Sequence, residues 1–151
     1  MIDSNPKNAV TKSIIVELDA PDAFRVWTEQ INQWWPAGHS MSGDPDTKLF
    51  IEASAGGRFY ERASNGMEHV WGAVEIWEPP DRLAFSWYLG SSREMPTRVE
   101  VQFVSLDGNR TRIELEHRGP ELIGRLWQQR VAIFNSAWDK VLSGFAQFIT
   151  F

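Results

Sequence analysis

Two titratable side chains, Glu61 and His117, stand among apolar residues in segments that otherwise alternate like strands. A carboxylate with apolar neighbours has a raised pKa and can serve as a general base or hold a ligand hydroxyl. A histidine in such a place can shuttle protons or bond a ligand carbonyl. Each also has a structural interpretation: Glu61 can pair with Arg58 or Arg62 near a sheet edge, and His117 can bond a backbone group beside Gly119. The sequence therefore offers two catalytic candidates and no catalytic motif.

The histidines at positions 39, 69 and 117 have neither helical pair spacing nor a carboxylate motif around them, so we expect no metal site. His39 follows a Trp-Trp pair in a loop that could gate a cavity mouth, although a surface histidine explains it equally. A nucleophile elbow, a phosphate-binding glycine loop and a dinucleotide fingerprint are all missing from the sequence, so no cofactor is expected. The sequence leaves open whether any reaction is catalysed.

Composition bounds the class of protein. A chain of 151 residues is expected to form one domain, residues 1–151, with a loose tail over 1–9. A net charge of −5 argues against nucleic acid, and no apolar run is long enough to insert into a membrane. The chain has no cysteine, and a cytoplasmic location is the default expectation. Eight Trp and nine Phe either fill a core or line a space for an apolar guest.

The elements that would position these residues end in a helix over 133–151. Its apolar residues recur with the three-and-four spacing of one helical face, and a helix of this length is roughly 25 Å long. Residues 121–132 are expected to be helical as well, and 19–35 to be a helical region that Asp19 or Ala20 caps and Pro36 ends. The face of the terminal helix comprises Phe134, Ala137, Trp138, Val141, Leu142, Phe145, Phe148 and Ile149.

Alternation and turn signals predict strands over 10–18, 48–53, 58–63, 68–78, 82–89, 97–106 and 110–118. Strands that pair in sequence order form an antiparallel sheet, and helices collected on one side of it make the class α+β.

The turns predict which residues share a face. A two-residue loop at Asn65-Gly66 and a four-residue loop over 79–82 leave Trp71 and Trp77 pointing outward, where with Tyr60 they could form an association patch for a homodimer. A one-residue slip would exchange the two faces. A three-residue loop over 107–109 sets Val99, Val101 and Phe103 across from His117, Leu115 and Ile113, with cross-strand charge pairs on the reverse side. The inner face of the other strands then holds Phe59, Glu61, Val70, Gly72, Val74, Ile76, Leu83, Phe85 and Trp87.

An ordered set of short motifs runs through these elements from Pro21 to Trp138. The set resembles the START-like, helix-grip superfamily (SRPBCC), which includes the birch pollen allergen and polyketide cyclases. The branch it is most similar to is that of bacterial domains like the activator of the ninety-kilodalton heat-shock chaperone ATPase. The motifs are Pro21-Asp22-Ala23-Phe24, Val26-Trp27, Trp34-Trp35, Gly56-Gly57-Arg58-Phe59, Trp71-Gly72, Pro79-Pro80-Asp81-Arg82-Leu83, Phe85-Ser86-Trp87, Leu115-Glu116-His117-Arg118-Gly119 and the Trp138 helix.

The resemblance implies a curved sheet of six to seven strands around the C-terminal helix, two short helices after the first strand, and a pocket between sheet and helix. We expect the pocket to bind a small hydrophobic molecule such as a lipid, a polyketide or an aromatic metabolite. Three other functions stay open: a cyclase, dehydratase or hydrolase that uses the same pocket, a domain that acts on a chaperone ATPase, and a stress-response partner without a ligand. The alternative to any pocket is a closed core packed by the same residues. The ligand-binding candidates are Trp35, His39, Phe50, Phe59, Glu61, Val74, Phe85, Trp87, Phe103, His117, Trp138, Val141 and Phe145.

Overall fold

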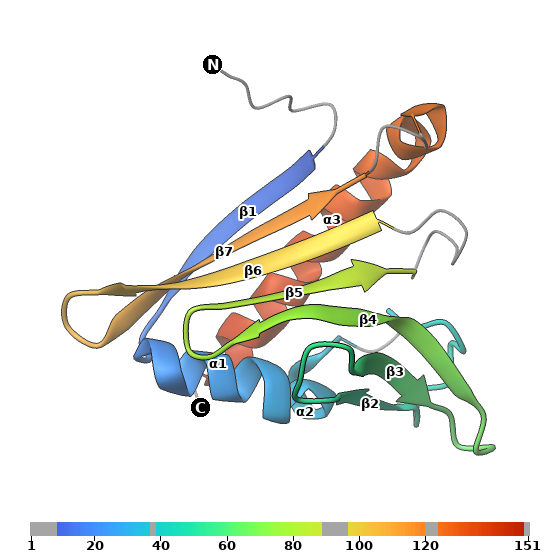
Figure 1. Cartoon of the computed structure of the whole chain (residues 1–151), viewed down its shortest axis with the longest axis horizontal. Helices are drawn as coiled ribbons and strands as arrows, with labels where there is room; N and C mark the ends of the chain where they lie inside the picture. Colours follow the sequence, from blue (N-terminus) through green and yellow to red (C-terminus); the bar gives the residue numbers. More distant parts are fainter. Residues whose placement is uncertain (1–8, 37–38, 89–96, 120–123, 150–151) are drawn as a thin grey trace.

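The computed structural model describes residues 9–36, 39–88, 97–119 and 124–149, with the backbone alone for 124–129 (Figure 1). The predicted tail thus lies outside the described residues except for Ala9, which opens the first strand. The elements are β1 (Ala9–Val16), α1 (Ala20–Glu29), α2 (Ile31–Trp34), β2 (Lys48–Ile51), β3 (Arg58–Arg62), β4 (Glu68–Glu78), β5 (Arg82–Trp87), β6 (Thr97–Leu106), β7 (Arg110–Arg118) and α3 (Gly124–Ile149).

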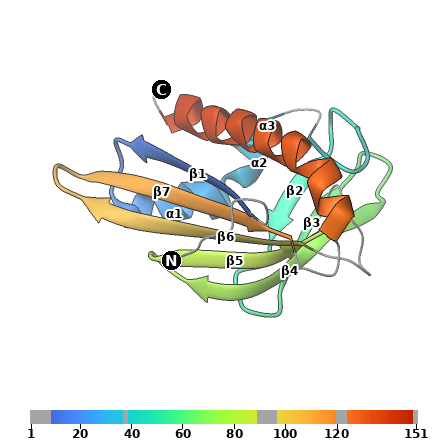
Figure 2. The same cartoon turned by 90° about the horizontal axis from the view of Figure 1, so that it is seen from above.

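The strands form one antiparallel sheet in the order β1-β7-β6-β5-β4-β3-β2. The sheet curves, α3 lies along its concave side, and α1 and α2 lie toward one end of the molecule (Figures 1 and 2). The α+β helix-grip architecture predicted from the sequence is therefore confirmed. Among the residues described, no helix combines the length and apolarity needed to span a bilayer.

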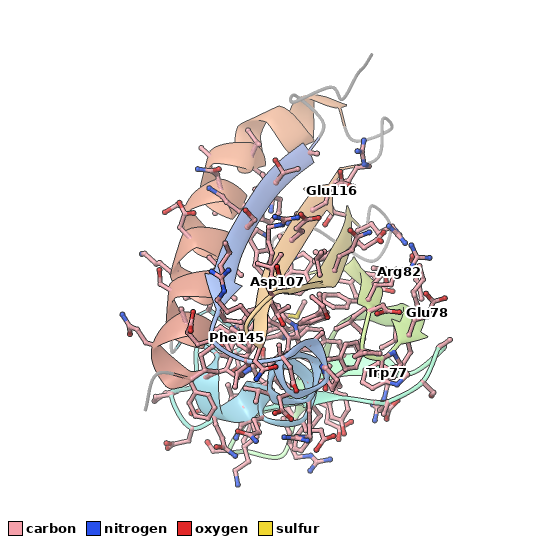
Figure 3. All side chains as sticks on the ribbon, turned by 90° about the vertical axis from the view of Figure 1, so that its left-hand side faces the viewer. Trp77, Glu78, Arg82, Asp107, Glu116 and Phe145 are labelled. Carbon is pink, nitrogen blue, oxygen red and sulfur yellow. The ribbon has the colours of Figure 1, made fainter. Side chains whose placement is uncertain are left out.

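The C-terminal helix is one continuous element of 26 residues, about 39 Å long, rather than two joined helical segments. The predicted apolar face is the buried one: Trp138 and Phe145 are 2% and 0% exposed. Figure 3 shows Phe145 between α3 and the sheet, on the opposite side of the sheet from Arg82 and Glu78. Because the helix and the sheet bury their apolar faces against each other, α3 closes the interior.

Helix α1 begins where its sequence signals place it. The Asp19 carboxylate caps the helix by accepting from the Asp22 amide at 3.0 Å, and Pro21 lies in the first turn. Its buried stripe includes Phe24 and Trp27, which pack toward the sheet interior. The second helix ends before Pro36, and the Trp35 that follows it is half-buried.

The register predicted for β3, β4 and β5 is wrong in part. The hairpin after β3 has Ala63 bonded to Met67, so its loop is three residues long rather than two, and Glu61 faces His69 rather than Val70. A register shift between Phe59 and Tyr60 then restores the predicted pairing of Phe59 with Gly72.

The turn between β4 and β5 also has three residues, because Glu78 pairs with Arg82. A second register shift follows between Val74 and Ile76. Each shift adds a residue on one strand and so exchanges the faces locally.

These shifts place two tryptophans inside that the sequence placed outside. Trp71 is fully buried, and Trp77 packs edge-on against the Phe24 ring with a centroid distance of 5.2 Å. Val70 pairs with the outward Tyr60 and Ile76 pairs with Ala84, so these two take outer positions instead. The outward aromatic patch that suggested a homodimer therefore does not form.

Strands β6 and β7 pair as predicted, with Val99 opposite His117 and Phe103 opposite Ile113. The predicted cross-strand charge pairs are wrong, because Arg98 lies opposite Arg118 and like charges face each other. The ion pairs of β6 and β7 on this face instead join Arg98 to Glu75 of β4 and Glu100 to Arg82 of β5, or join neighbours along one strand. Such exposed pairs contribute little to stability.

Gly72 is required by the close approach of β4 to β5. A Cβ atom at this residue would lie 1.7 Å from the Ser86 carbonyl oxygen, which is backbone and cannot move aside. We expect Gly72→Ala to lower the free energy of unfolding by at least ~3 kcal/mol, since overpacking at a fixed backbone cannot relax.

Gly66→Ala is the control. A Cβ atom at Gly66 would enter open space, so only the positive φ of 88° opposes this substitution. It should cost about 1 kcal/mol in the same urea denaturation experiment. Equal losses for the two variants would contradict the close approach.

Candidate functional site

The centre of the interior is an aromatic cage, defined here as Phe59, Trp71, Trp87 and Trp138 around the indole of Trp35. The centroid distances from Trp35 to these rings are 6.3, 5.4, 6.2 and 6.0 Å. The four surrounding rings are at most 3% exposed, whereas Trp35 is half-buried. Its indole N–H donates to the His39 carbonyl oxygen at 2.7 Å. The cage thus encloses one side chain, and that side chain is the partly exposed one of the five rings.

A second ring cluster fills the interior toward α1 and α2. Trp27 contacts Trp34, Phe103 and Phe145 with centroid distances of 4.7, 6.2 and 5.2 Å. Two predicted ligand-binding residues, Phe103 and Phe145, therefore pack in this cluster rather than around Trp35. Trp27 Nε1 is buried without a hydrogen-bond partner. This cluster is the closed core that the sequence left as an alternative.

Glu61 lies beside the cage and is 0% exposed. Its Oε1 accepts from the Met41 amide at 2.6 Å, the Ser42 amide at 3.3 Å and Trp71 Nε1 at 2.8 Å. Its Oε2 accepts from the hydroxyls of Ser42 and Thr47, each at 2.7 Å. The carboxylate therefore binds the segment 41–47 on one side and the cage on the other.

These bonds decide the protonation state of Glu61. Burial raises the pKa of its carboxyl, but the hydrogen bonds from Ser42, Thr47, Trp71 and Met41 outweigh burial and hold the pKa below its ordinary value. The raised pKa expected from the sequence is wrong for this reason. The expected pairing with Arg58 or Arg62 is not formed either, because both guanidinium groups bind Glu68.

His117 is held in a directed chain of hydrogen bonds. Trp138 Nε1 lies 2.8 Å from His117 Nδ1, and an indole N–H can only donate, so Nδ1 accepts. Nε2 therefore carries the proton and donates to Thr97 Oγ1 at 2.6 Å. The Thr97 hydroxyl donates in turn to the Trp87 carbonyl oxygen at 3.2 Å. The imidazole is thus neutral, with one tautomer fixed.

Burial lowers the pKa of His117 to about 3. A second proton would have to enter at Nδ1, against the indole N–H of Trp138. The structural interpretation is therefore favoured for His117, although its partners are Thr97 and Trp138 rather than a backbone group beside Gly119. A neutral histidine with both ring nitrogens bonded to the protein cannot exchange protons with a ligand without breaking this chain.

The other candidates divide between the inner and the outer face. Val74, Phe85 and Val141 are buried in the core. Phe50 pairs with Tyr60 across β2 and β3 and stacks on it at 5.1 Å, on the outer face and away from the cage. The His39 side chain is half-buried, and burial with the nearby positive charge of Lys140 lowers its pKa.

Sequence reasoning missed Trp71, Ser42, Thr47 and Thr97. The only signal for the hydroxyls is chemical: a buried carboxylate or imidazole needs donors or acceptors, and Ser and Thr near it are the usual source. Trp71 carried no such signal, because a strand shift decides which way it points.

Described residues line three pockets that lie at the surface. They have volumes of about 410, 610 and 470 Å³ and lie on the outer face of β1, β6 and β7, between α2 and α3, and between α1 and the β4–β5 turn. None of the three is lined by a predicted ligand-binding residue. Within the described ranges, no three His, Asp or Glu side chains come together as a candidate metal site.

The buried, neutral His117 makes stability depend on pH. Its pKa is about 3 when folded and near 6.5 when unfolded, so its contribution is complete above pH 6.5 and is lost as the pH falls toward 3. Between pH 6.5 and 5 we expect this group to lower the free energy of unfolding by about 1.5 kcal/mol. His117→Gln should remove this part of the pH dependence of the free energy of unfolding. In the wild-type protein, nitrogen-detected NMR should show the Nε2–H tautomer of His117 throughout this pH range. An imidazole that titrates with a midpoint near 6.5 would contradict the assignment.

Solved structures share this fold over almost the whole chain. The self-sacrificing resistance protein CalC from Micromonospora echinospora is 26% identical, with a TM-score of 0.71 and 96% of each chain covered. The anthrahydroquino-gamma-pyrone synthase Txn09 is 29% identical, with a TM-score of 0.60 over 95% of this chain and 99% of that one. A protein from Rhodobacter sphaeroides is 17% identical with a TM-score of 0.72, over 99% and 97% of the two chains, and this likeness shows the fold alone.

No curated protein sequence matches the chain. Residues 18–150 match the family described as "Activator of Hsp90 ATPase homolog 1-like protein". That span begins just after β1, runs through α3 and includes every residue of the aromatic cage, Glu61 and His117. The chain therefore belongs to the Activator of Hsp90 ATPase homolog 1-like protein family.

Proposed function

We propose that the protein binds a small planar aromatic molecule of the polyketide type, which takes the place of the Trp35 indole inside the aromatic cage. The observation that carries the proposal is the position of Trp35 itself. The partly exposed Trp35 ring is enclosed by four buried rings, and this supports a site for a flat aromatic group in which the Trp35 side chain acts as a plug.

The cage favours flat ligands over flexible chains. The planes of the surrounding rings make angles of 44° to 90° with the Trp35 indole, so a ligand ring there would meet mainly edges and tilted faces. Aromatic pairs in such arrangements gain ~0.5–1.5 kcal/mol beyond the area they bury. A rigid ring system also loses less conformational freedom on binding than an acyl chain.

One relative above 25% identity supports this ligand class. Txn09 is named as a synthase of an anthrahydroquino-gamma-pyrone, and CalC as a resistance protein. The proposal extends to this chain only the aromatic character of the synthase's named product.

Binding without turnover is the form that the geometry supports. A cyclase or hydrolase acting in the same place would need an acid–base group, and the two candidates are Glu61 and His117. Glu61 is saturated by donors and held ionised, while His117 is neutral and bonded at both nitrogens. Neither presents a free proton or lone pair toward Trp35.

The test is a comparison of 1,8-dihydroxyanthraquinone with palmitate, by tryptophan fluorescence titration and by NMR of the indole N–H signals. We expect the anthraquinone to bind in the micromolar range or tighter, palmitate to bind at least tenfold more weakly, and the Trp35 Nε1–H signal to shift as its bond to His39 breaks. Phe59→Leu should weaken anthraquinone binding roughly tenfold, because a cage wall is lost.

Phe50→Leu is the matched control, since Phe50 lies on the adjacent strand but on the outer face. It should change the affinity less than twofold. Equal effects of the two substitutions, or preference for palmitate, would contradict the proposal.

A further inference from the structure

We infer that Glu61 is a positioning residue that latches the segment 39–47 over the aromatic cage, and so sets how often the place of Trp35 opens. The role of Glu61 in admitting a ligand rests on the proposed function, whereas its role in holding the segment closed does not. The name latch is used below for Glu61 together with Met41, Ser42 and Thr47.

The latch is attached to the body of the protein at a buried point. Strand β3 pairs with β4 at Glu61, and the carboxylate is fully buried there. Four of its five hydrogen bonds go to the segment, from two amides and two hydroxyls. Hydrogen bonds to an ionised group are stronger than those between neutral groups. The segment therefore closes onto one charged group.

The fifth bond connects the latch to the cage. Trp71 Nε1 donates to Glu61 Oε1, and the Trp71 ring lies 5.4 Å from Trp35. Trp35 in turn donates to the His39 carbonyl oxygen, at the start of the same segment. Release of the segment from Glu61 would therefore leave the bond from Trp71 to Glu61 in place and free the end of the chain that holds the Trp35 indole N–H.

The segment is braced internally, so it can move as a unit. Ser42 Oγ accepts from the Asp44 amide at 3.1 Å, and the Thr47 amide donates to the Asp44 carbonyl oxygen at 3.1 Å. Its second attachment is exposed: the Asp44 carboxylate accepts from the amide and hydroxyl of Ser64 at 2.7 and 2.6 Å. Water competes more for an exposed attachment of this kind than for the partly buried bonds to Glu61, so those bonds carry most of the closure.

The experiment removes the partners on the segment and leaves Glu61 in place. A Ser42→Ala, Thr47→Val double variant removes both hydroxyls from Oε2, and with Ser42 Oγ it also removes the acceptor of the Asp44 amide. Thr47→Val alone removes one hydroxyl from Oε2 and leaves that internal bond in place, so it should act in the same direction. Hydrogen exchange of the ligand-free protein is followed by mass spectrometry on a peptide that covers residues 36–49. We expect exchange there to become at least roughly tenfold faster, because charge-assisted bonds are lost. Glu61→Gln should act in the same direction.

Glu52→Gln is the matched control: it removes an exposed carboxylate that binds Arg58 and takes no part in the latch. It should change exchange in that peptide less than twofold. Thermal melting of every variant checks that the fold is intact. If the double variant exchanges like wild type, the inference is overturned.

A kinetic readout separates a latch from a simple structural bond. In stopped-flow mixing with 1,8-dihydroxyanthraquinone, the double variant should bind and release the probe roughly tenfold faster, with the dissociation constant unchanged within threefold. Faster exchange with unchanged association would overturn the role in admission. If wild type does not bind the probe but exchange still rises in the double variant, the proposed function fails while the latch stands.

Discussion

The carboxylate of Glu61 is a buried negative charge without a cation beside it in the described structure. Such a group is stable only if hydrogen-bond donors replace the water it has lost. The two arginines of the same strand cannot do so, because they lie on the other face, with Arg58 over the Tyr60 ring and Arg62 over the Phe50 ring. The donors come instead from the segment 41–47 and from Trp71. This requirement fixes the segment, orients Trp71 and thereby shapes the wall of the aromatic cage.

A neutral buried group, His117, is satisfied in the same way beside another ring of the cage, Trp138. His117, Thr97 and Trp138 satisfy one another and tie α3 to the sheet through side chains as well as through apolar contact. With both titratable groups used in this way, neither has a free proton or lone pair to exchange with a ligand. This arrangement supports the proposal of binding by shape and aromatic contact, because the fold alone does not decide the chemistry.

Elements with clear local signals could be predicted from the sequence. The face of α3 follows from helical spacing, and the β6–β7 register follows from the Asp-Gly-Asn turn, in which Gly108 and Asn109 have φ of 75° and 57°. The register of β4 could not be predicted, because the loops on either side differ by one residue from the expected lengths. The two register shifts that follow have no residue signature.

The candidate site was predictable only to the same extent. Phe59, Trp87 and Trp138 belong to it because their strands or helix face inward by simple periodicity. Trp71 entered through a register shift, and the partners of Glu61 came from a loop whose path no pattern indicates. The identity of the inward residues was therefore accessible from the sequence, whereas the bonds that fix their protonation states were not.

A crystal structure of the protein with a planar aromatic ligand tests the central claim most directly. The account predicts a ligand ring enclosed by Phe59, Trp71, Trp87 and Trp138, with the Trp35 indole turned out and its bond to the His39 carbonyl broken. A ligand in the surface groove between α2 and α3, with Trp35 unmoved among the four rings, would contradict it.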